Sequence, residues 1–198
     1  MGDQMAMKLI CGIGLNDSHA KTSRNEGGRR VWCKFYDAWK SMLTRCYSAA
    51  NNRRRPTYVG CSVDPEWLTF SVFRNWMGAQ DWQGKQLDKD LLVPGNKIYS
   101  PDTCVFVSRE LNQFLTDSGR SRGEWPIGVS LDKKSLKFKA TCCNPITGKP
   151  EHLGLFIDPC EAHEAWRNRK HQHALRYADM QTDPRIAAAL RTRFAPED

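Results

Sequence analysis

Asp88 and Asp90 are two acidic residues separated by one position, a spacing that could support cation-dependent chemistry. They lie in the segment LDKDL, where apolar and charged residues alternate. In a β-strand, this alternation predicts both carboxylates on one face and Lys89 on the other. Two carboxylates on one face can share a cation. A solvated strand edge with no chemical role is the alternative that the same pattern allows.

The neighbouring residues predict the elements that would hold this pair. Val93–Asn96 consists of turn residues, and Thr103–Val107 is β-branched and apolar, as expected of a second strand. Ser108 is a suitable N-cap for a short helix that contains Asn112. We therefore predict two strands followed by a helix (ββα).

The segment TCVFVSRELN, residues 103–112, resembles the HNH endonucleases, and in particular their phage homing-endonuclease branch, which has the pattern N-L-R-W-V-T-x-x-x-N. The last Asn of that pattern falls on Asn112, and the family's metal-binding Asp falls on Asp88. The family's general-base His falls on Lys89, and its middle Asn falls on Thr103. The segments YDAWKSMLTRCYS, EWLTF, LDKD and YSPDTC also look like phage proteins labelled HNH-like.

This resemblance implies a ββα-metal domain that hydrolyses DNA phosphodiester bonds, with Mg²⁺ or Mn²⁺ held by Asp88 and Asp90. Asp88, Lys89, Asp90 and Asn112 are then the expected catalytic residues. Three candidates for the base stay open because Lys89 occupies the position of the family's His: Asp90, metal-bound hydroxide, or a Lys89 with a lowered pKa.

The sequence before this site predicts a basic arm and two aromatic helices. We interpret residues 1–30 as a flexible basic N-terminal arm and residues 31–116 as the HNH-like domain. Apolar residues at helical spacing predict a helix over Val31–Tyr47, and a second helix begins at Asp64-Pro65 after a strand over Tyr58–Val63. Between them, a basic loop is either a phosphate clamp or a solvated loop, and it contains Arg53, Arg54 and Arg55.

A polar segment over residues 117–125 is the expected linker to a second domain, residues 126–180. Three short strands, around 127–130, 136–140 and 152–156, precede a helix that begins at Asp158-Pro159. The elements GVS, LKFKA, HLGLF and EAHEAW resemble the Apetala or ethylene-response-factor DNA-binding domain, in which the sheet contacts the major groove. Residues 181–198 are expected to form a last helix. The predicted fold class is α+β.

The exposed face of that sheet is expected to bind double-stranded DNA, mainly at phosphates because lysines dominate it. A solvated sheet face is the alternative. The residues expected there are Lys133, Lys134, Lys137, Lys139, Lys149 and His152.

The composition agrees with a polyanionic partner, since 30 Lys and Arg against 22 Asp and Glu give a net charge of +8. No apolar run approaches the roughly 20 residues of a membrane span, so we expect no membrane partner and a cytoplasmic protein, in a bacterial host if phage-encoded. The eight cysteines include no CxxC pair, which argues for buried reduced thiols rather than zinc.

Three functions follow, and the first is a metal-dependent DNA endonuclease that nicks or cuts duplex DNA. The second is a catalytically inactive DNA-binding protein, a repressor or a blocker, built on a degenerate HNH hairpin. The third is a structural protein that binds no nucleic acid. The oligomeric state, monomer or homodimer, stays open.

Overall fold

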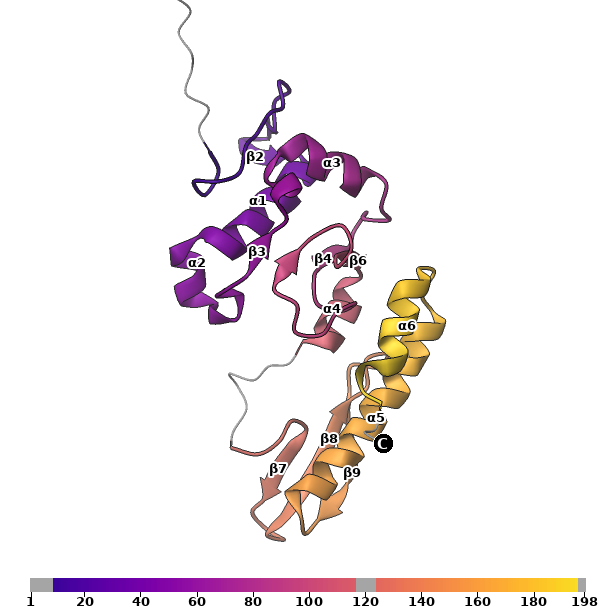
Figure 1. Cartoon of the computed structure of the whole chain (residues 1–198). Helices are drawn as coiled ribbons and strands as arrows, with labels where there is room; N and C mark the ends of the chain where they lie inside the picture. Colours follow the sequence, from indigo (N-terminus) through magenta and orange to yellow (C-terminus); the bar gives the residue numbers. More distant parts are fainter. Residues whose placement is uncertain (1–8, 117–123, 196–198) are drawn as a thin grey trace, which may run out of the picture. The chain divides into compact units, whose positions relative to one another are not determined.

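Apolar residues recurring at helical and strand spacing build an α+β chain, and the computed structural model describes residues 9–116 and 124–195 (Figure 1). The chain divides into two units, Met1–Val107 and Ser108–Asp198, here called the N-terminal and C-terminal units. Six α-helices and several small sheets, mostly antiparallel, make up the described ranges. No helix within 9–116 or 124–195 combines the length and apolar character needed to cross a bilayer.

The core of the N-terminal unit is an aromatic cluster between α1 (Lys34–Tyr47) and α3 (Phe70–Gly78). The predicted apolar stripes face each other there, and Trp39 is fully buried with its ring 5.4 Å from that of Phe70. The indole Nε1 of Trp39 donates a 2.7 Å hydrogen bond to the carbonyl of Trp67. This bond satisfies the polar group of a buried aromatic side chain and fixes the 3₁₀ turn η2 (Pro65–Leu68) on α1.

The strands of the N-terminal unit are short and pair in twos. The antiparallel strands β4 (Gln86–Asp88) and β6 (Val105–Val107) form the predicted pair of the ββα segment. The remaining elements are β1 (Ser23–Glu26) paired with β2 (Arg29–Trp32), β3 (Ser62–Val63) paired in parallel with β5 (Ile98–Tyr99), α2 (Ala49–Arg54) and the 3₁₀ turn η1 (Pro56–Tyr58).

The first thirty residues differ from the expected arm wherever the structure describes them. Leu15 forms a parallel bridge with Thr69, and β1 and β2 form a hairpin over 23–32. Gly14 is buried, and it packs so closely on the core that an added Cβ would overlap Leu43. The helix expected from Val31 consequently starts at Lys34, and a 3₁₀ turn replaces the first part of the strand expected over 58–63.

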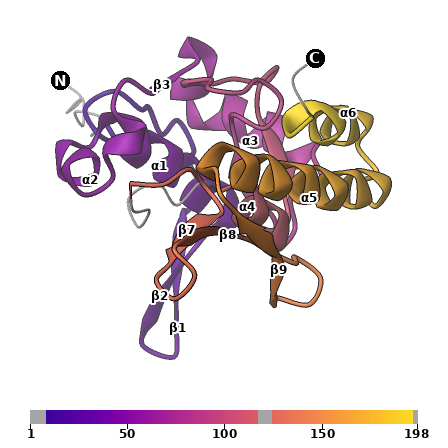
Figure 2. The ribbon, with the colours of Figure 1, turned by 90° about the horizontal axis from the view of Figure 1, so that it is seen from below.

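The C-terminal unit is a three-stranded antiparallel sheet with one face covered by a long helix, as predicted. The sheet has the order β7 (Val129–Asp132), β8 (Lys137–Cys143), β9 (Pro150–Phe156), and α5 (Pro159–Asp179) packs on it (Figure 2). Asp158 caps α5, since its carboxylate accepts the N–H of Cys160 at 2.9 Å. The last helix, α6 (Pro184–Arg193), packs on α5.

The helix α4 (Arg109–Leu115) belongs to the C-terminal unit, whereas the sequence interpretation grouped it with residues 31–116. The ring of Phe114 packs against that of Tyr177 with centroids 5.1 Å apart, and the Phe114 carbonyl accepts a 2.6 Å hydrogen bond from Lys170. These contacts to α5 explain the assignment. Most of the expected linker, residues 117–123, lies outside the described residues.

The Asp88 turn and the candidate nucleic-acid interface

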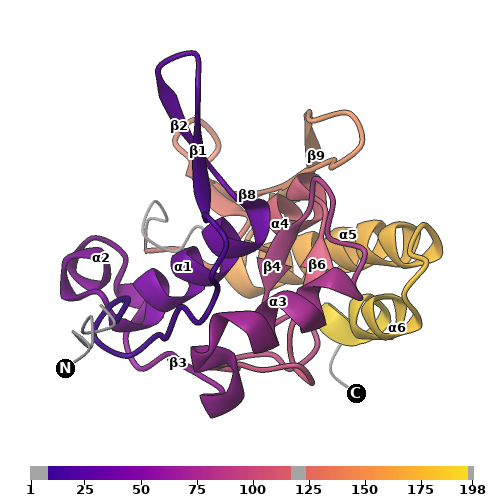
Figure 3. The same ribbon diagram turned by 90° about the horizontal axis from the view of Figure 1, so that it is seen from above.

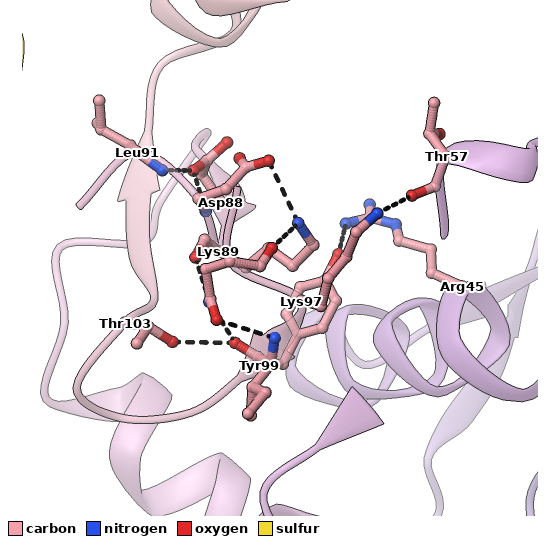
Figure 4. Close-up of polar contacts among 11 residues, drawn as sticks. Arg45, Thr57, Asp88, Lys89, Leu91, Lys97, Tyr99 and Thr103 are labelled. Carbon is pink, nitrogen blue, oxygen red and sulfur yellow. Dashed lines mark hydrogen bonds and ion pairs between the residues drawn. The ribbon is translucent and has the colours of Figure 1, made fainter. Parts of the chain in front are cut away.

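The prediction that Asp88 and Asp90 share one face of a strand is wrong, because strand β4 ends at Asp88. The Oδ1 atom of Asp88 accepts the backbone N–H groups of Asp90 at 3.0 Å and of Leu91 at 2.7 Å (Figure 4). A short acidic side chain that captures N–H groups two and three residues ahead bends the chain into a turn. The strand expected through Leu91 is therefore replaced by an Asp-capped turn.

Lys89 is buried, and it lies in the turn after β4 rather than on a strand face. Its ammonium lies 3.2 Å from Oδ2 of Asp90 and donates a 2.7 Å hydrogen bond to the carbonyl of Asn96. A general base must accept a proton, whereas Lys89 here donates to a carboxylate and to a carbonyl. The geometry thus supports a structural role for Lys89 more directly than a catalytic one.

The pKa of Asp88 is raised above its ordinary value of 3.8, first by burial and then by the negative charge of Asp90. Hydrogen bonds from the N–H groups of Leu91 and Asp90, together with the Lys89 ammonium, oppose this shift only in part. The two carboxylates therefore lie close enough to interact.

The side chains of Asp88 and Asp90 do not form a preformed metal site. Oδ1 of Asp88 already accepts two N–H groups, and Oδ2 of Asp90 faces the Lys89 ammonium. Within residues 9–116 and 124–195, no three His, Cys, Asp or Glu side chains gather in a group able to hold a metal. The expected ligand pair thus fits Mg²⁺ or Mn²⁺ poorly as a protein-only site. Asn112 lies on α4, which belongs to the C-terminal unit.

The expected clamp residues Arg53, Arg54 and Arg55 are all exposed, at the end of α2 and directly after it. Arg54 and Arg55 line a polar hollow beside α1. Four cations and a single carboxylate border this hollow, so its balance of charge is basic. Its lining residues are Asp37, Lys40, Ser41, Thr44, Arg45, Asn51, Arg54 and Arg55. Arg45 also reaches the hydroxyl of Tyr99 at 3.4 Å (Figure 4).

The sheet of the C-terminal unit has one covered face and one open face. On the covered face, Ala140 and Cys142 are buried, and Glu151 accepts a 3.1 Å hydrogen bond from Nε2 of His173 on α5. Lys137 and Lys139 alternate along β8 with Phe138 and Ala140, so they point the other way. Lys137 and Lys139 are accordingly both exposed.

The other predicted DNA-contacting residues surround these two lysines. His152 is exposed and pairs across the strands with Thr141, which lies two residues beyond Lys139 on β8. Lys133 and Lys134 are exposed in the β7–β8 turn, and Lys149 is exposed in the β8–β9 connection. We call these six residues the lysine face. All six residues are exposed.

The sequence interpretation missed the folded β1–β2 hairpin. The signal was present, because Gly27-Gly28 separates two short polar and basic runs, SRNE and RRVW. Two glycines at this spacing are typical of a tight hairpin turn. Their φ angles of 56° and 80° are the left-handed values that such a turn requires.

Comparisons with protein-family models, with curated proteins and with solved structures find no match to this chain.

Proposed function

We propose that this chain binds double-stranded DNA through phosphate contacts made by the lysine face. The observation that supports the proposal is the two-sided sheet, with Lys137 and Lys139 in line on the open face while α5 covers the other. A phosphate backbone presents regularly spaced charges, and lysine ammonium groups bind phosphates without reading bases. The net charge of +8 and the resemblance to the Apetala domain favour the same partner.

Local electrostatics also favour this surface. Asp132, the acidic residue directly opposite Lys137, is engaged by the turn, where its carboxylate accepts Ser135 Oγ at 2.7 Å and the N–H of Lys134 at 3.3 Å. These hydrogen bonds, with that of Ser135 first, lower the pKa of Asp132. The hydrogen bonds hold this carboxylate in the turn, and its charge also attracts Lys139; the face keeps a positive balance because its lysines outnumber this one carboxylate.

The test is duplex binding by fluorescence anisotropy over a salt series, with the full chain and its Lys137→Ala/Lys139→Ala variant. The plot of log affinity against log salt should lose about two units of slope, because each lost phosphate contact removes about one. The matched control is Arg185→Ala/Arg191→Ala, which also removes two exposed cations from the same unit. Equal effects of the two variants would sink the proposal, since only total charge would then matter.

A DNA endonuclease is the second candidate, and the interaction between the Asp88 and Asp90 carboxylates favours it. Mg²⁺ is often bound by one or two carboxylates together with phosphate oxygens of the substrate, so DNA itself would have to complete the ligand set. The chain would be incubated with supercoiled plasmid in Mg²⁺, Mn²⁺ or EDTA, beside Asp88→Asn. Metal-dependent nicking that Asp88→Asn loses supports the nuclease. If the plasmid stays intact under all conditions, the remaining hypothesis is a DNA-binding protein without catalytic activity.

A further inference from the structure

The β1–β2 hairpin is a basic ribbon that extends away from α1 and α3 of its own unit (Figures 2 and 3). Arg24, Asn25, Glu26, Arg29 and Arg30 are all exposed in it. The half-buried residues Ser23, Val31 and Trp32 lie at its base. The ribbon therefore buries its root and leaves the half nearest the turn open on both faces.

The root is fixed firmly to the core of the N-terminal unit. The ring of Trp32 stacks on buried Tyr36 with centroids 5.4 Å apart, and the Lys40 ammonium lies 4.6 Å from the Trp32 centroid. The N–H of Cys33 donates to the carbonyl of Thr22 at 2.8 Å, which closes the base of the hairpin. An isolated two-stranded ribbon is only marginally stable, so this anchorage explains how a polar one persists here.

The charge of the ribbon suits a polyanion. Arg24, Arg29 and Arg30 stand against the one carboxylate of Glu26, and Lys21 precedes the first strand. Arg24 pairs with Glu26, which leaves Arg29 and Arg30 without an ion pair to any described carboxylate. The exposed, basic side chains of this ribbon do not contribute to the hydrophobic core, and they are suited to contact with nucleic acid.

The strand register separates the side chains by face. Asn25 lies directly opposite Arg30, so these two share one face near the turn. Arg24, Arg29 and the Glu26 carboxylate, which lies directly opposite Arg29, project from the other face. The Arg30 guanidinium lies 5.6 Å from the ring centroid of Trp32, two residues along the same face, which orients it. Arginine pairs with the guanine edge and asparagine with the adenine edge through two hydrogen bonds each.

We infer that the β1–β2 ribbon enters the major groove of duplex DNA, with Asn25 and Arg30 toward the base edges and Arg24 and Arg29 toward phosphates. The major groove is wide enough, at about 12 Å, to admit a two-stranded ribbon. The inference rests on the proposed function because it takes duplex DNA as the partner. It concerns a different surface, however, and adds sequence reading to phosphate binding.

The test begins with selection of preferred sequences from a pool of random duplexes by the full chain. Affinities for a selected and a scrambled duplex are then compared for the wild type, Asn25→Ala/Arg30→Ala, and Arg29→Ala. The first variant should lose about tenfold or more of the preference, since one good base contact supplies at least that discrimination. Arg29→Ala removes the same charge from the opposite face and should weaken both duplexes equally.

Methylation of guanine N7 gives a second readout that needs only the wild-type protein. Methyl groups in the major groove of the selected site should block binding, because they occupy the edge that Arg30 is inferred to contact. Two results overturn the inference: binding that tolerates N7 methylation, or a sequence preference that Asn25→Ala/Arg30→Ala retains. Equal competition by single-stranded nucleic acid or RNA also overturns it.

The two proposals fail in different ways. If Lys137→Ala/Lys139→Ala binds like the wild type while the ribbon variant loses preference, the lysine face is not the binding surface and the ribbon inference stands. If the ribbon variant keeps the preference while the lysine variant binds weakly, the ribbon inference is overturned alone. A wild-type chain that binds no duplex overturns both.

Discussion

Lys89 and Asn96 hold each other by two hydrogen bonds of 2.7 Å: the Lys89 ammonium donates to the Asn96 carbonyl, and the Asn96 amide donates to the Lys89 carbonyl. The Asn96 side chain also bonds both backbone groups of Ile98, donating to its carbonyl at 2.6 Å and accepting its N–H at 3.0 Å. This reciprocal clamp closes the segment between β4 and β5. Lys89, which was expected at a catalytic position, thus holds a loop together.

Asn96→Ala should lower the free energy of unfolding by about 2 kcal/mol, because it removes three side-chain hydrogen bonds, including the one that the partly buried Lys89 carbonyl accepts. Urea denaturation measures the change. Lys97→Ala is the neighbouring control, since it removes one exposed hydrogen bond to the Thr57 carbonyl and should cost about 0.5 kcal/mol or less. Equal costs for the two variants would contradict the clamp.

Lys89→Met should also destabilise the chain, by about 2 kcal/mol, because the Asp90 carboxylate and the Asn96 carbonyl lose their ammonium partner. Methionine has a similar volume, so the change in packing is small. The cost should be smaller in a background that carries Asp90→Asn, where no charge is left behind. A double-mutant cycle from denaturation curves gives this coupling. A cost that does not depend on residue 90 would show that the ion pair contributes nothing.

Asp88 should make the chain less stable as pH rises. Its pKa is raised in the folded state, so between its ordinary value of 3.8 and the folded value the folded chain binds more protons than the unfolded chain. Stability therefore falls as pH increases through this window. Asp88→Asn should remove that component, and the difference between wild-type and variant denaturation curves from pH 3.5 upward isolates it. A difference that does not change with pH would refute the expected shift.

Glu151 should act in the opposite direction. Its pKa is lowered, first by the hydrogen bond from the Asn144 amide at 2.8 Å and further by the bond to His173. The stability that it contributes is then fully present above its ordinary pKa of 4.5 and is lost as pH falls through the lowered value. Melting temperatures of the wild type and Glu151→Gln should converge on acidification. Curves that stay parallel from pH 6 to pH 3 would rule this out.

Gly128→Ala should destabilise the C-terminal unit strongly, because a Cβ there would overlap the indole of Trp166 at a φ of +80°. Gly148→Ala is the matched control: its φ is +68°, but no atom lies within 4 Å of the new Cβ. The control should cost about 1 kcal/mol from backbone strain alone, and Gly128→Ala several times more. Thermal melting of both variants decides whether the contact with Trp166 adds to the strain.

Local sequence patterns were sufficient to predict those elements whose conformation depends on neighbouring residues alone. Helical spacing predicted the buried stripe of α1, and the side chains of Ser108 and Asp158 cap α4 and α5 as expected. Alternation in β8 placed Lys137 and Lys139 on one exposed face, since α5 packs against the other face of that sheet. In each case, one short-range rule determines the conformation.

The Asp88 turn could not be predicted because two local rules conflict there. Alternation in LDKDL favours a strand, while an aspartate also competes for N–H groups ahead of it, and the hydrogen bonds to Asp90 and Leu91 prevail. The position of α4 depends on contacts made by Lys170 and Tyr177, more than fifty residues further along the chain. No pattern near Phe114 indicates them.

The separate aromatic cores make the two units spectroscopically unequal. Five of the seven tryptophans, residues 32, 39, 67, 76 and 82, belong to the N-terminal unit, and only Trp125 and Trp166 belong to the C-terminal unit. Tryptophan emission during denaturation is therefore weighted toward the N-terminal unit, whereas circular dichroism at 222 nm also records the 21 residues of α5. Emission and dichroism curves that separate would reveal two units melting on their own, and coincident curves would reveal one cooperative transition.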